Sequence, residues 1–291
     1  MKLYTIETEF FKLDGGAMFG VVPKVIWNKM NPADENNLCT WAMRCLLIEV
    51  DNKVILIDNG IGNKQDEKFM SHYHLDTTHN LDKSLTAAGF TKEDITDVIL
   101  THLHFDHCGG SIEIVNNQLV PAFKNATYWS NEAHWKWATE PNAREKASFL
   151  KENILPIQES GQLRFVEREN NIPDNRLEYV TSSIHPSISF RFANGHTNAM
   201  MLPQISYNGR TIVYMADLLP SIHHIPMPYV MGYDMFPLTT MQEKHIFLNE
   251  ALQNDYILYF EHDPVNECCN LQQTNKGIRH KDCFTISEIV N

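Results

Sequence analysis

The sequence predicts a layered α/β fold in a single domain, and three observations support that fold class. Apolar, β-branched runs alternate with amphipathic, helix-like segments along the 291 residues. No low-complexity segment, short repeat or linker-like stretch divides the chain. Apolar residues make up 43% and charged residues 21%, which is the composition of a globular protein with a sizeable core. Strand-rich segments in two similar halves, mixed with helices, therefore favour an α/β sandwich spanning residues 1–291.

The first half begins with a hairpin and continues with a helix and a buried strand. Residues 44–62 predict two strands across an Asp-Asn turn, ending at Asp58 and a glycine loop. Residues 83–90 contain the end of a short amphipathic helix closed by Gly89. Residues 94–102 predict a buried strand, because they form an almost continuous apolar run.

The second half repeats the alternation after a helical insertion. Residues 130–160 look helical and lie outside the strand framework, so we expect them, with residues 15–40, near the rim of an active site. The later elements are strands over 187–195, 199–217 (with an Asn-Gly hairpin turn) and 255–263, and a helix over 239–253. In that helix Thr240 and Glu243 have the spacing of a capping box.

Charge and composition exclude several classes of partner. The chain has 24 Lys and Arg against 36 Asp and Glu, a net charge of −12, and no basic run. A protein that grips a phosphate backbone needs a basic face, so nucleic acid is not expected as a partner. No stretch approaches the length of a membrane span, and the N-terminus lacks the pattern of a signal peptide. The six cysteines are irregularly spaced, so we expect reduced, mostly buried thiols in a cytoplasmic protein.

A dense group of metal-ligand side chains follows the strand at 94–102. His102, His104, Asp106 and His107 occupy six positions in a turn that ends in two glycines. Burying four such groups without a cation would cost several kcal/mol of desolvation. Four ligands of mixed type leave little room around one tetrahedral zinc, so the spacing favours two adjacent metal ions.

Further ligands are expected at other strand ends. His196 follows one apolar strand, Asp217 ends the run TIVYMAD, and His262 ends YILYFEHD. Each could leave the edge of a sheet toward a shared cleft. His185 competes with His196, but it precedes Pro186 and stands before its strand instead of after it. We therefore expect His196 to be the ligand.

These motifs, taken in order, resemble the metallo-β-lactamase superfamily of binuclear metallohydrolases. The set is H-x-H-x-D-H, then Gly-His-Thr at 195–197, then Asp217 and His262 at strand ends. The resemblance covers nearly the whole chain and implies an αββα four-layer sandwich with the metals at one edge of two sheets. One departure is GHTNAM, where many relatives continue with Pro-Gly after Gly-His-Thr.

The resemblance also implies roles for individual residues. His102, His104 and His196 correspond to ligands of the first metal, and Asp106, His107 and His262 to those of the second, with Asp217 as the bridge. Asp58, in LIDNG, matches an aspartate that orients a ligand histidine. Zinc is the first expectation for both ions, while manganese, iron and cobalt accept the same nitrogen and oxygen ligands.

Within the superfamily, the sequence favours the lactonase branch. His104 stands where oxygen-reducing relatives carry glutamate, and no cysteine takes the place of a second-metal ligand. The segments LDGGAMFGVVPKVIWNK and GYDMFPLT look like the lactonases that open N-acyl homoserine lactones and their organophosphate-hydrolysing relatives. Their apolar residues would suit a lipophilic acyl chain: Met18, Phe19, Val21, Trp27, Met227, Tyr229, Met231 and Phe236.

The expected reaction is hydrolysis by a metal-bridging hydroxide. Two divalent cations can lower the pKa of a bridging water from its value in bulk solvent to about 7, and the hydroxide would attack a carbonyl carbon. We count Asp106 with the catalytic residues. Candidates for the proton donor to the leaving group follow Asp217 in the chain: His223, His224, Tyr229 and Tyr233. Cys108 is read as a packing residue, because a metal hydroxide makes a thiol nucleophile unnecessary.

Three functions are consistent with these residues. The first is a hydrolase of lactones or other small carboxylic esters, and the second is a phosphodiester or phosphotriester hydrolase that uses the same site. The third is a non-catalytic metal-binding protein, which the presence of all the expected ligands disfavours. The oligomeric state is left open, with a homodimer as one alternative.

Overall fold

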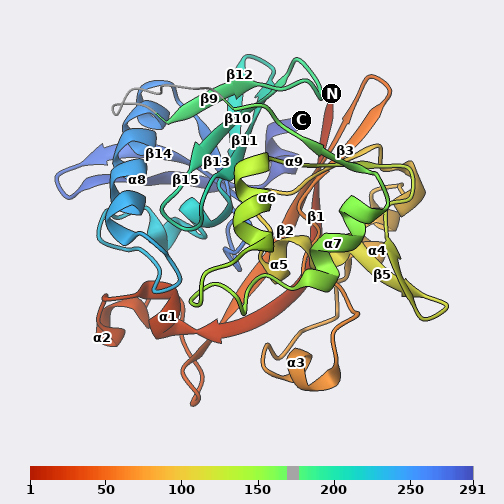
Figure 1. The fold of residues 1–291 in the computed structure, drawn as a ribbon. Coiled ribbons are helices and arrows are strands. Elements are labelled where there is room, and N and C mark those ends of the chain that lie inside the picture. Colours follow the sequence, from red (N-terminus) through yellow and green to blue (C-terminus); the bar gives the residue numbers. More distant parts are fainter. Residues whose placement is uncertain (169–176, 291) are drawn as a thin grey trace. The chain divides into compact units, whose positions relative to one another are not determined.

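The computed structural model describes residues 1–168 and 177–290, and it confirms the mixed α/β class (Figure 1). Backbone contacts divide the chain into two compact units. Unit 1 comprises Met1–Phe10, Met43–Glu167 and Val290, and unit 2 comprises Phe11–Ala42 and Arg168–Ile289. The single domain over 1–291, the stacking of four layers and the placement of residues 15–40 and 130–160 at a rim stay predictions.

A six-stranded sheet forms the framework of unit 1, and two of its strands also supply residues to unit 2. Its strands, in spatial order, are β1 (Lys2–Asp14), β2 (Leu38–Val50), β3 (Lys53–Ile57), β4 (Asp97–Ile99), β7 (Thr127–Ser130) and β8 (Leu163–Phe165). The predicted Asp-Asn hairpin is confirmed, because Val50 pairs with Lys53. Strands β3 and β4 are parallel, so Asp58 and Thr101 follow them at the same edge of the sheet.

Short helices and a small hairpin complete unit 1. They are α3 (Glu67–Ser71), α4 (Leu81–Ala87), η1 (Lys92–Asp94), α5 (Phe105–Cys108), η2 (Gly109–Ser111), β5 (Ile112–Val115), β6 (Gln118–Pro121), α6 (Glu132–Thr139) and α7 (Lys151–Glu159). The end of α4 near Gly89 is confirmed, whereas the helical prediction for 130–160 is confirmed only in part, because non-helical residues 140–150 separate α6 from α7 and Ser130 belongs to β7. Helix α7 packs on β5, β6 and α5.

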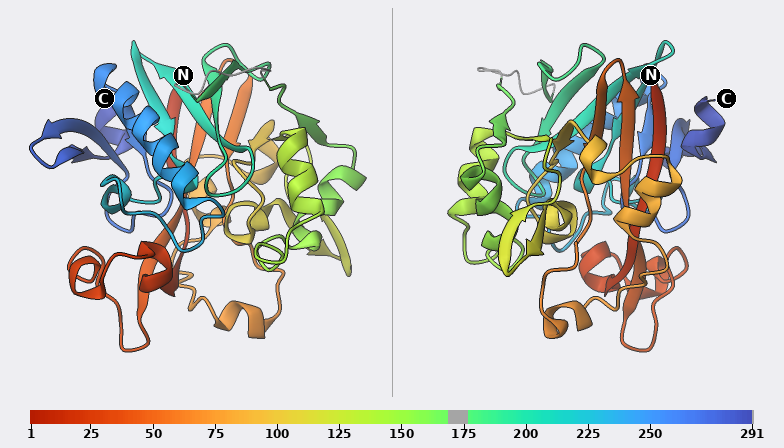
Figure 2. Two further views of the ribbon diagram at one scale, coloured as in Figure 1. Left: turned by 60° about the vertical axis from the view of Figure 1, so that its left-hand side comes forward. Right: turned by 90° about the vertical axis from the view of Figure 1, so that its right-hand side faces the viewer.

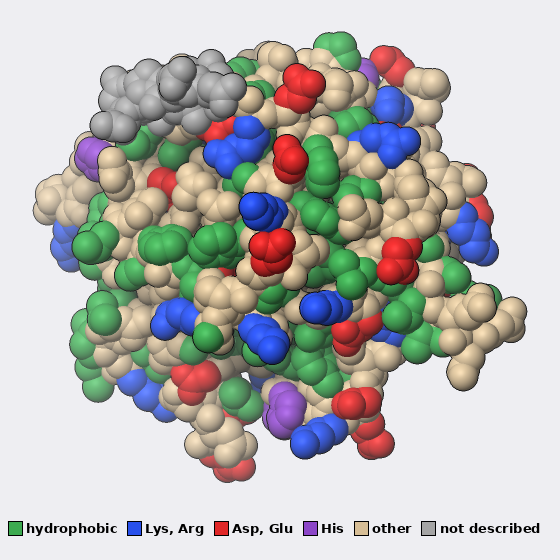
Figure 3. All heavy atoms as spheres, in the orientation of Figure 1, with side chains coloured by type: hydrophobic (Ala, Val, Ile, Leu, Met, Phe, Trp, Pro, Cys, Tyr) green, Lys and Arg blue, Asp and Glu red, His purple; other side chains and the backbone are tan. Residues whose placement is uncertain are grey.

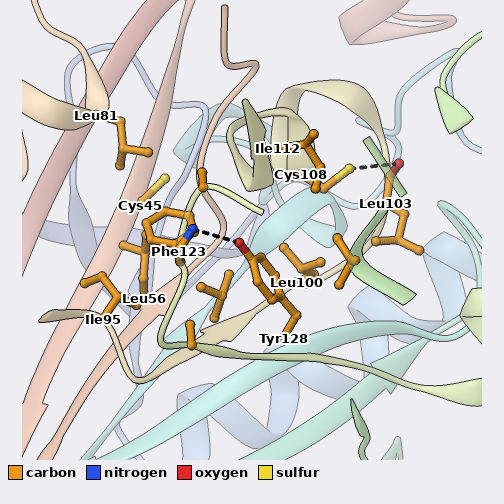
Figure 4. Packing of buried hydrophobic residues seen from close by; sticks show 14 of the residues in the cluster. Cys45, Leu56, Leu81, Ile95, Leu100, Leu103, Cys108, Ile112, Phe123 and Tyr128 are labelled. Atoms are coloured by element: carbon orange, nitrogen blue, oxygen red, sulfur yellow. Dashed lines mark hydrogen bonds between the residues drawn. The ribbon is translucent and has the colours of Figure 1, made fainter. Parts of the chain in front are cut away.

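The core of unit 1 lies against the segment that carries the histidine motif (Figure 4). Tyr128 is fully buried; its hydroxyl accepts from the N–H of Phe123 at 3.1 Å and donates to the carbonyl of Ser111 at 3.0 Å. Cys108 is also fully buried, and its thiol donates to the carbonyl of Leu103 at 3.4 Å. The packing role expected for Cys108 therefore agrees with its surroundings.

A seven-stranded sheet forms the framework of unit 2. Its strands, in spatial order, are β15 (Gly277–Phe284), β14 (Cys268–Thr274), β13 (Ile257–Tyr259), β12 (Arg210–Tyr214), β11 (Met200–Tyr207), β10 (Ile188–Ala193) and β9 (Glu178–Thr181). The Asn-Gly turn between β11 and β12 is confirmed, since Asn208 and Gly209 both have positive φ angles. Strands β12 and β13 are parallel, which places the segments after them at one edge.

The helices of unit 2 include one long helix, α8. They are α1 (Gly15–Phe19), α2 (Lys24–Trp27), η3 (Ala216–Leu218), η4 (Ile222–His224), α8 (Pro237–Gln253) and α9 (Ile286–Val290). Helix α8 packs along β14 and β15, as the left view of Figure 2 shows.

The capping box predicted at Thr240 and Glu243 is wrong. Helix α8 begins earlier, with Pro237 in its first turn, where proline is well tolerated because its missing N–H would be unpaired. Thr240 therefore lies inside the helix, and its N–H already donates to the carbonyl of Phe236 at 2.9 Å. The freed carboxylate of Glu243 accepts hydrogen bonds from another segment instead.

Surface charge and thiol burial largely follow the expectations. Five of the six cysteines are buried thiols outside any disulfide of the described residues, while Cys283 is exposed, so the expected burial is wrong for Cys283. On the face drawn in Figure 3, Lys and Arg are interspersed with Asp and Glu. Within the described residues, no helix is both long and apolar enough to cross a membrane.

Candidate metal centre

In unit 1, Asp58 ties the predicted ligands to the sheet. It follows β3 with a positive φ of 55° and is fully buried. Its Oδ1 accepts the N–H of Thr101 at 2.8 Å, and its Oδ2 accepts the hydroxyl of Thr101 at 2.6 Å. The same Oδ2 lies 3.1 Å from Nδ1 of His107. A carboxylate accepts here, so Nδ1 of His107 carries the proton and Nε2 keeps a lone pair for a metal.

His102 and His104 converge on one point. Nε2 of His102 lies 3.1 Å from Nδ1 of His104. Two ligand nitrogens on one tetrahedral zinc are about 3.3 Å apart, given Zn–N bonds of about 2.0–2.1 Å. The other nitrogen of each ring has its own partner. Nδ1 of His102 lies 3.1 Å from the hydroxyl of Thr101, and Nε2 of His104 lies 3.4 Å from Oε1 of Glu145. The spacing of this pair therefore suits a shared metal ion.

The remaining member of the motif, Asp106, is in the first turn of α5. Its Oδ2 lies 3.8 Å from Nε2 of His107, and the centroids of the His102 and His107 rings are 3.9 Å apart. Unit 1 thus brings together all four residues of the motif with Asp58. We call these five residues the unit 1 half-site.

Two buried residues that the sequence did not single out hold this half-site. Glu145 places Oε1 3.4 Å from Nε2 of His104, and its Oε2 accepts from the indole of Trp137 at 2.6 Å. His134 accepts the backbone N–H of Leu103 at Nε2, at 2.9 Å. No sequence signal distinguishes Glu145 from neighbouring surface acids, because its burial depends on the fold of residues 140–150.

Backbone packing fixes the end of the motif. A Cβ on Gly109 would lie 2.0 Å from the carbonyl oxygen of Ile61, and one on Gly110 would lie 2.2 Å from that of Asn59. Only glycine permits this approach. Lys64 donates to the carbonyl of Gly109, and burial lowers the pKa of its ammonium to about 8. The loop after β3 therefore packs against the two glycines that end the histidine motif and fixes their backbone.

In unit 2, Asp217 joins two predicted histidine ligands. It follows β12 in η3, with 7% of its surface exposed. Its Oδ2 lies 3.0 Å from Nε2 of His196, and its Oδ1 lies 3.1 Å from Nε2 of His262. Each carboxylate oxygen thus faces a different histidine, which is the arrangement that a carboxylate bridging two metal ions requires. We call Asp217, His196 and His262 the unit 2 half-site.

His196 is held between two carboxylates. Its Nδ1 lies 3.0 Å from Oδ1 of Asp234, which is itself almost fully buried. Burial would lower the pKa of His196, but Asp217 and Asp234 outweigh that effect and raise it to about 10. This excess of negative charge around one imidazole is the condition that favours a bound cation.

The segment before His196 is held by helix α8. Glu243 accepts the N–H of Asn194 at 2.6 Å and that of Gly195 at 2.9 Å. Burial raises the pKa of Glu243 to about 7. Asp234 belongs to the segment GYDMFPLT, whose resemblance to lactonases was the available signal for it; Glu243 was visible only as an apparent cap.

His262 and His185 differ in their surroundings. Nδ1 of His262 donates to the carbonyl of Ala42 at 2.7 Å, which leaves Nε2 for a metal. His185 is half-buried in the loop before β10, where its Nδ1 lies 2.6 Å from the hydroxyl of Ser187. The structure therefore gives His185 a local hydrogen bond and places His196 beside Asp217.

The candidate proton donors after Asp217 occupy unlike environments. His224 is fully buried, with Nε2 2.9 Å from the carbonyl of Met18 and Nδ1 2.9 Å from the hydroxyl of Ser221. Its ring stacks on Phe19 at 5.0 Å, and burial lowers its pKa to about 3. His223 is half-buried, and burial lowers its pKa as well. His224 therefore packs against Phe19, and both of its ring nitrogens already have hydrogen-bond partners.

Tyr229 and Tyr233 lie farther along the same loop. Tyr229 is half-buried, and among the described residues no side chain hydrogen-bonds to its hydroxyl. Tyr233 is 40% exposed. Lys244 of α8, buried beneath the loop, donates to the carbonyls of Pro226, Met227 and Tyr229 at 3.1, 3.4 and 2.8 Å. A buried ammonium thus fixes the backbone that carries Tyr229.

The residues expected to form an acyl pocket divide into two groups. Four are buried in packing: Met18, Phe19, Trp27 and Met231. Val21 and Phe236 are exposed, while Met227 and Tyr229 are half-buried. Their role toward a substrate stays a prediction.

Comparisons with known proteins identify one family. A family model described as the metallo-beta-lactamase superfamily matches residues 44–262. An N-acyl homoserine lactonase from Bacillus cereus is 29% identical over 137 residues, which covers 44% of this chain and 48% of that protein. The chain thus matches about half the length of this curated relative.

Solved structures share the fold. A probable metal-dependent hydrolase from Staphylococcus aureus has a TM-score of 0.83 and 26% identity, covering 97% of this chain and 96% of that one. A dizinc quorum-quenching lactonase in complex with a product has a TM-score of 0.77 and 21% identity, covering 97% and 95%.

Proposed function

This chain belongs to the metallo-β-lactamase superfamily, and we propose that it is a hydrolase whose two half-sites together hold two divalent metal ions. His102, His104 and His196 would bind the first ion. Asp106, His107 and His262 would bind the second, with Asp217 shared between them. The proposal requires the half-sites of unit 1 and unit 2 to face each other when metal is bound.

One observation carries this proposal: the two oxygens of Asp217 face Nε2 of His196 and Nε2 of His262 separately. A carboxylate that bound a single metal ion would not need each of its two oxygens to face a different histidine. Nδ1 of His107 donates its proton in a hydrogen bond to Asp58, and Nδ1 of His262 donates to the carbonyl of Ala42, which leaves Nε2 of each ring unprotonated. Both rings therefore offer a neutral nitrogen, the form that binds a metal.

The bound cations would supply a hydroxide nucleophile at neutral pH and polarise the carbonyl under attack. The chain's own residues would do the rest. Asp58, Glu145 and Asp234 hold ligand rings in place through hydrogen bonds, so little reorganisation is needed during the reaction. Zinc is the metal we propose first, because the ligands are nitrogen and oxygen and the 3.1 Å between Nε2 of His102 and Nδ1 of His104 suits two ligands of one zinc ion.

We propose Tyr229 as the proton donor to the leaving group. Its hydroxyl has no partner among the described side chains, whereas both nitrogens of His224 do. Lys244 fixes the backbone of Tyr229, which would limit the positions that the hydroxyl can take. His223 is the alternative on the same loop.

We propose a lactone or another small carboxylic ester as the substrate. The support is the Bacillus cereus lactonase, together with the apolar residues of the loops that carry Phe236 and Met227. The sequence also predicts a cytoplasmic location. The oligomeric state stays open, with a homodimer as one alternative.

Metal analysis and a substrate panel test the proposal on one preparation. The panel contains acyl lactones, aryl esters, phosphotriesters and phosphodiesters. About two metals per chain with lactone turnover would support it. Two metals with phosphoester turnover alone would contradict the substrate class, and no bound metal after reconstitution would contradict the hydrolase itself.

A further inference from the structure

A cavity in unit 2 lies apart from the predicted metal ligands. Its volume is about 280 Å³, and it is lined by α8, the loop at 225–228 and the hairpin of β14 and β15. No residue of the unit 2 half-site lines it. The reaction proposed above therefore leaves the cavity without a role.

Three of its lining residues can carry positive charge. They are His245 on α8, and Lys276 and Arg279 on the hairpin. Among the described residues that line the cavity, none is Asp or Glu, although the chain as a whole has a net charge of −12. Within the same described residues, neither Lys276 nor Arg279 has a carboxylate within salt-bridge distance. The cavity is thus a positively charged pocket on an acidic protein.

The rest of the lining is largely apolar. Ile225 and Leu248 are each 1% exposed and form buried wall, while Met227 and Ile278 are half-buried. An apolar wall beside unpaired cations suits a ligand with an anionic head and a short hydrocarbon chain. A guanidinium binds carboxylate in a paired, planar geometry, which makes Arg279 the natural partner of the head.

We propose that this cavity binds a small amphiphilic carboxylate. The carboxylate would lie at Arg279 and Lys276, and the alkyl chain would lie along Leu248 and Met227. The binding step does not depend on the hydrolase assignment. If that assignment holds, an opened acyl lactone is itself a carboxylate with an alkyl chain, and the cavity would then bind the product class.

A ligand bound in this cavity would contact the loop that carries Tyr229. Met227 lines the cavity, and its carbonyl accepts from Lys244, which also holds the carbonyl of Tyr229. A ligand pressed against Met227 would therefore contact the segment that Lys244 fixes. This contact gives the cavity a direct connection to the proposed proton donor.

Calorimetry with sodium octanoate tests the proposal on the full-length protein. We expect saturable binding of one octanoate per chain that weakens as salt is raised, because screening reduces attraction between the charges. Arg279→Gln should weaken binding by about tenfold or more, the value of one charge-assisted hydrogen bond. Lys281→Gln is the matched control, because Lys281 lies on the same strand but does not line the cavity.

Two further probes separate the head from the chain. Inorganic phosphate tests whether charge alone suffices, and octyl glucoside tests the chain alone; both should bind at least about tenfold more weakly than octanoate. Equal octanoate affinity in wild type, Arg279→Gln and Lys281→Gln would overturn the proposal, as would the absence of saturable binding. Since these arms measure binding without turnover, they stand or fall separately from the hydrolase assignment.

Discussion

The two half-sites are built in opposite ways. In unit 1, four predicted ligands come from one turn, residues 102–107, and the loop after β3 packs against the glycines that follow them. In unit 2, the three predicted ligands follow three separate strands, and each contacts a partner from elsewhere in the chain. A local motif fixes its own geometry, whereas a dispersed one relies on the supporting residues. Mutations of those supports should therefore have larger effects in unit 2.

The largest effect is expected at the shared carboxylate. Asp217→Asn removes the charge that would balance two cations, so metal content should fall to about one ion per chain or less. Turnover should drop by about a thousandfold or more, which corresponds to about 4 kcal/mol of transition-state stabilisation. Elemental analysis and hydrolysis assays on the same sample measure both. Wild-type metal content in the variant would refute the bridging assignment.

A paired comparison of supporting carboxylates sharpens the contrast. Asp234→Asn should weaken metal binding by about 10–100-fold, because Asp234 orients His196 at 3.0 Å. Glu145→Gln in unit 1 should cost less than about tenfold, since its contact with His104 is longer, 3.4 Å, and the turn itself fixes that ring. Competition with a chelator gives both affinities. If the Glu145 variant loses more affinity, the dispersed half-site is not the more dependent one.

Neighbouring residues of α8 should give unit 2 a stability that depends on pH in two directions. The pKa of Glu243 is raised from 4.5 to about 7, so the folded state binds more protons and stability falls as pH rises between these values. The pKa of Lys244 is lowered from 10.5 to about 7, so stability rises with pH between 7 and 10.5. Each contribution should be on the order of 3–5 kcal/mol.

Denaturant unfolding at several pH values separates the two residues. Glu243→Gln should flatten the difference between pH 4.5 and 7, and Lys244→Met should flatten that between 7 and 10.5. Each variant is the control for the other, because they change separate pH ranges. Identical pH profiles in wild type and both variants would mean that neither group titrates with a shifted pKa.

The smallest effect is expected at the histidine outside the half-sites. His185→Ala should leave metal content and turnover unchanged, because its ring hydrogen-bonds to Ser187 and it belongs to neither half-site. The same assays as for Asp217 apply. Loss of a metal ion in this variant would show that His185, and not His196, is the ligand.

The sequence singled out the predicted ligands, but it did not single out most of the residues that support them. The turn at 102–107 can be recognised because it places four metal-binding side chains in six positions. Asp217 and His262 can be recognised because each follows an apolar strand. Glu145 and His134 act through burial and tertiary contacts, which no local pattern encodes. Asp234 could be found only through the resemblance of its segment, GYDMFPLT, to lactonases.

The long helix of unit 2 shows how a local pattern can mislead. Thr240 and Glu243 have the spacing of a capping box, but Pro237 starts the helix earlier, so Glu243 is free to accept from the segment before His196. The same local reasoning succeeded for the Asn-Gly turn at 208–209, where backbone preference alone decides the structure.

The central claim is that the two half-sites complete one binuclear centre, and electron paramagnetic resonance of protein loaded with Mn(II) tests it most directly. With two Mn(II) ions per chain bridged by Asp217, we predict an exchange-coupled spectrum that Asp217→Asn abolishes. A spectrum of isolated, uncoupled Mn(II) ions in the wild-type protein at the same loading would contradict the claim.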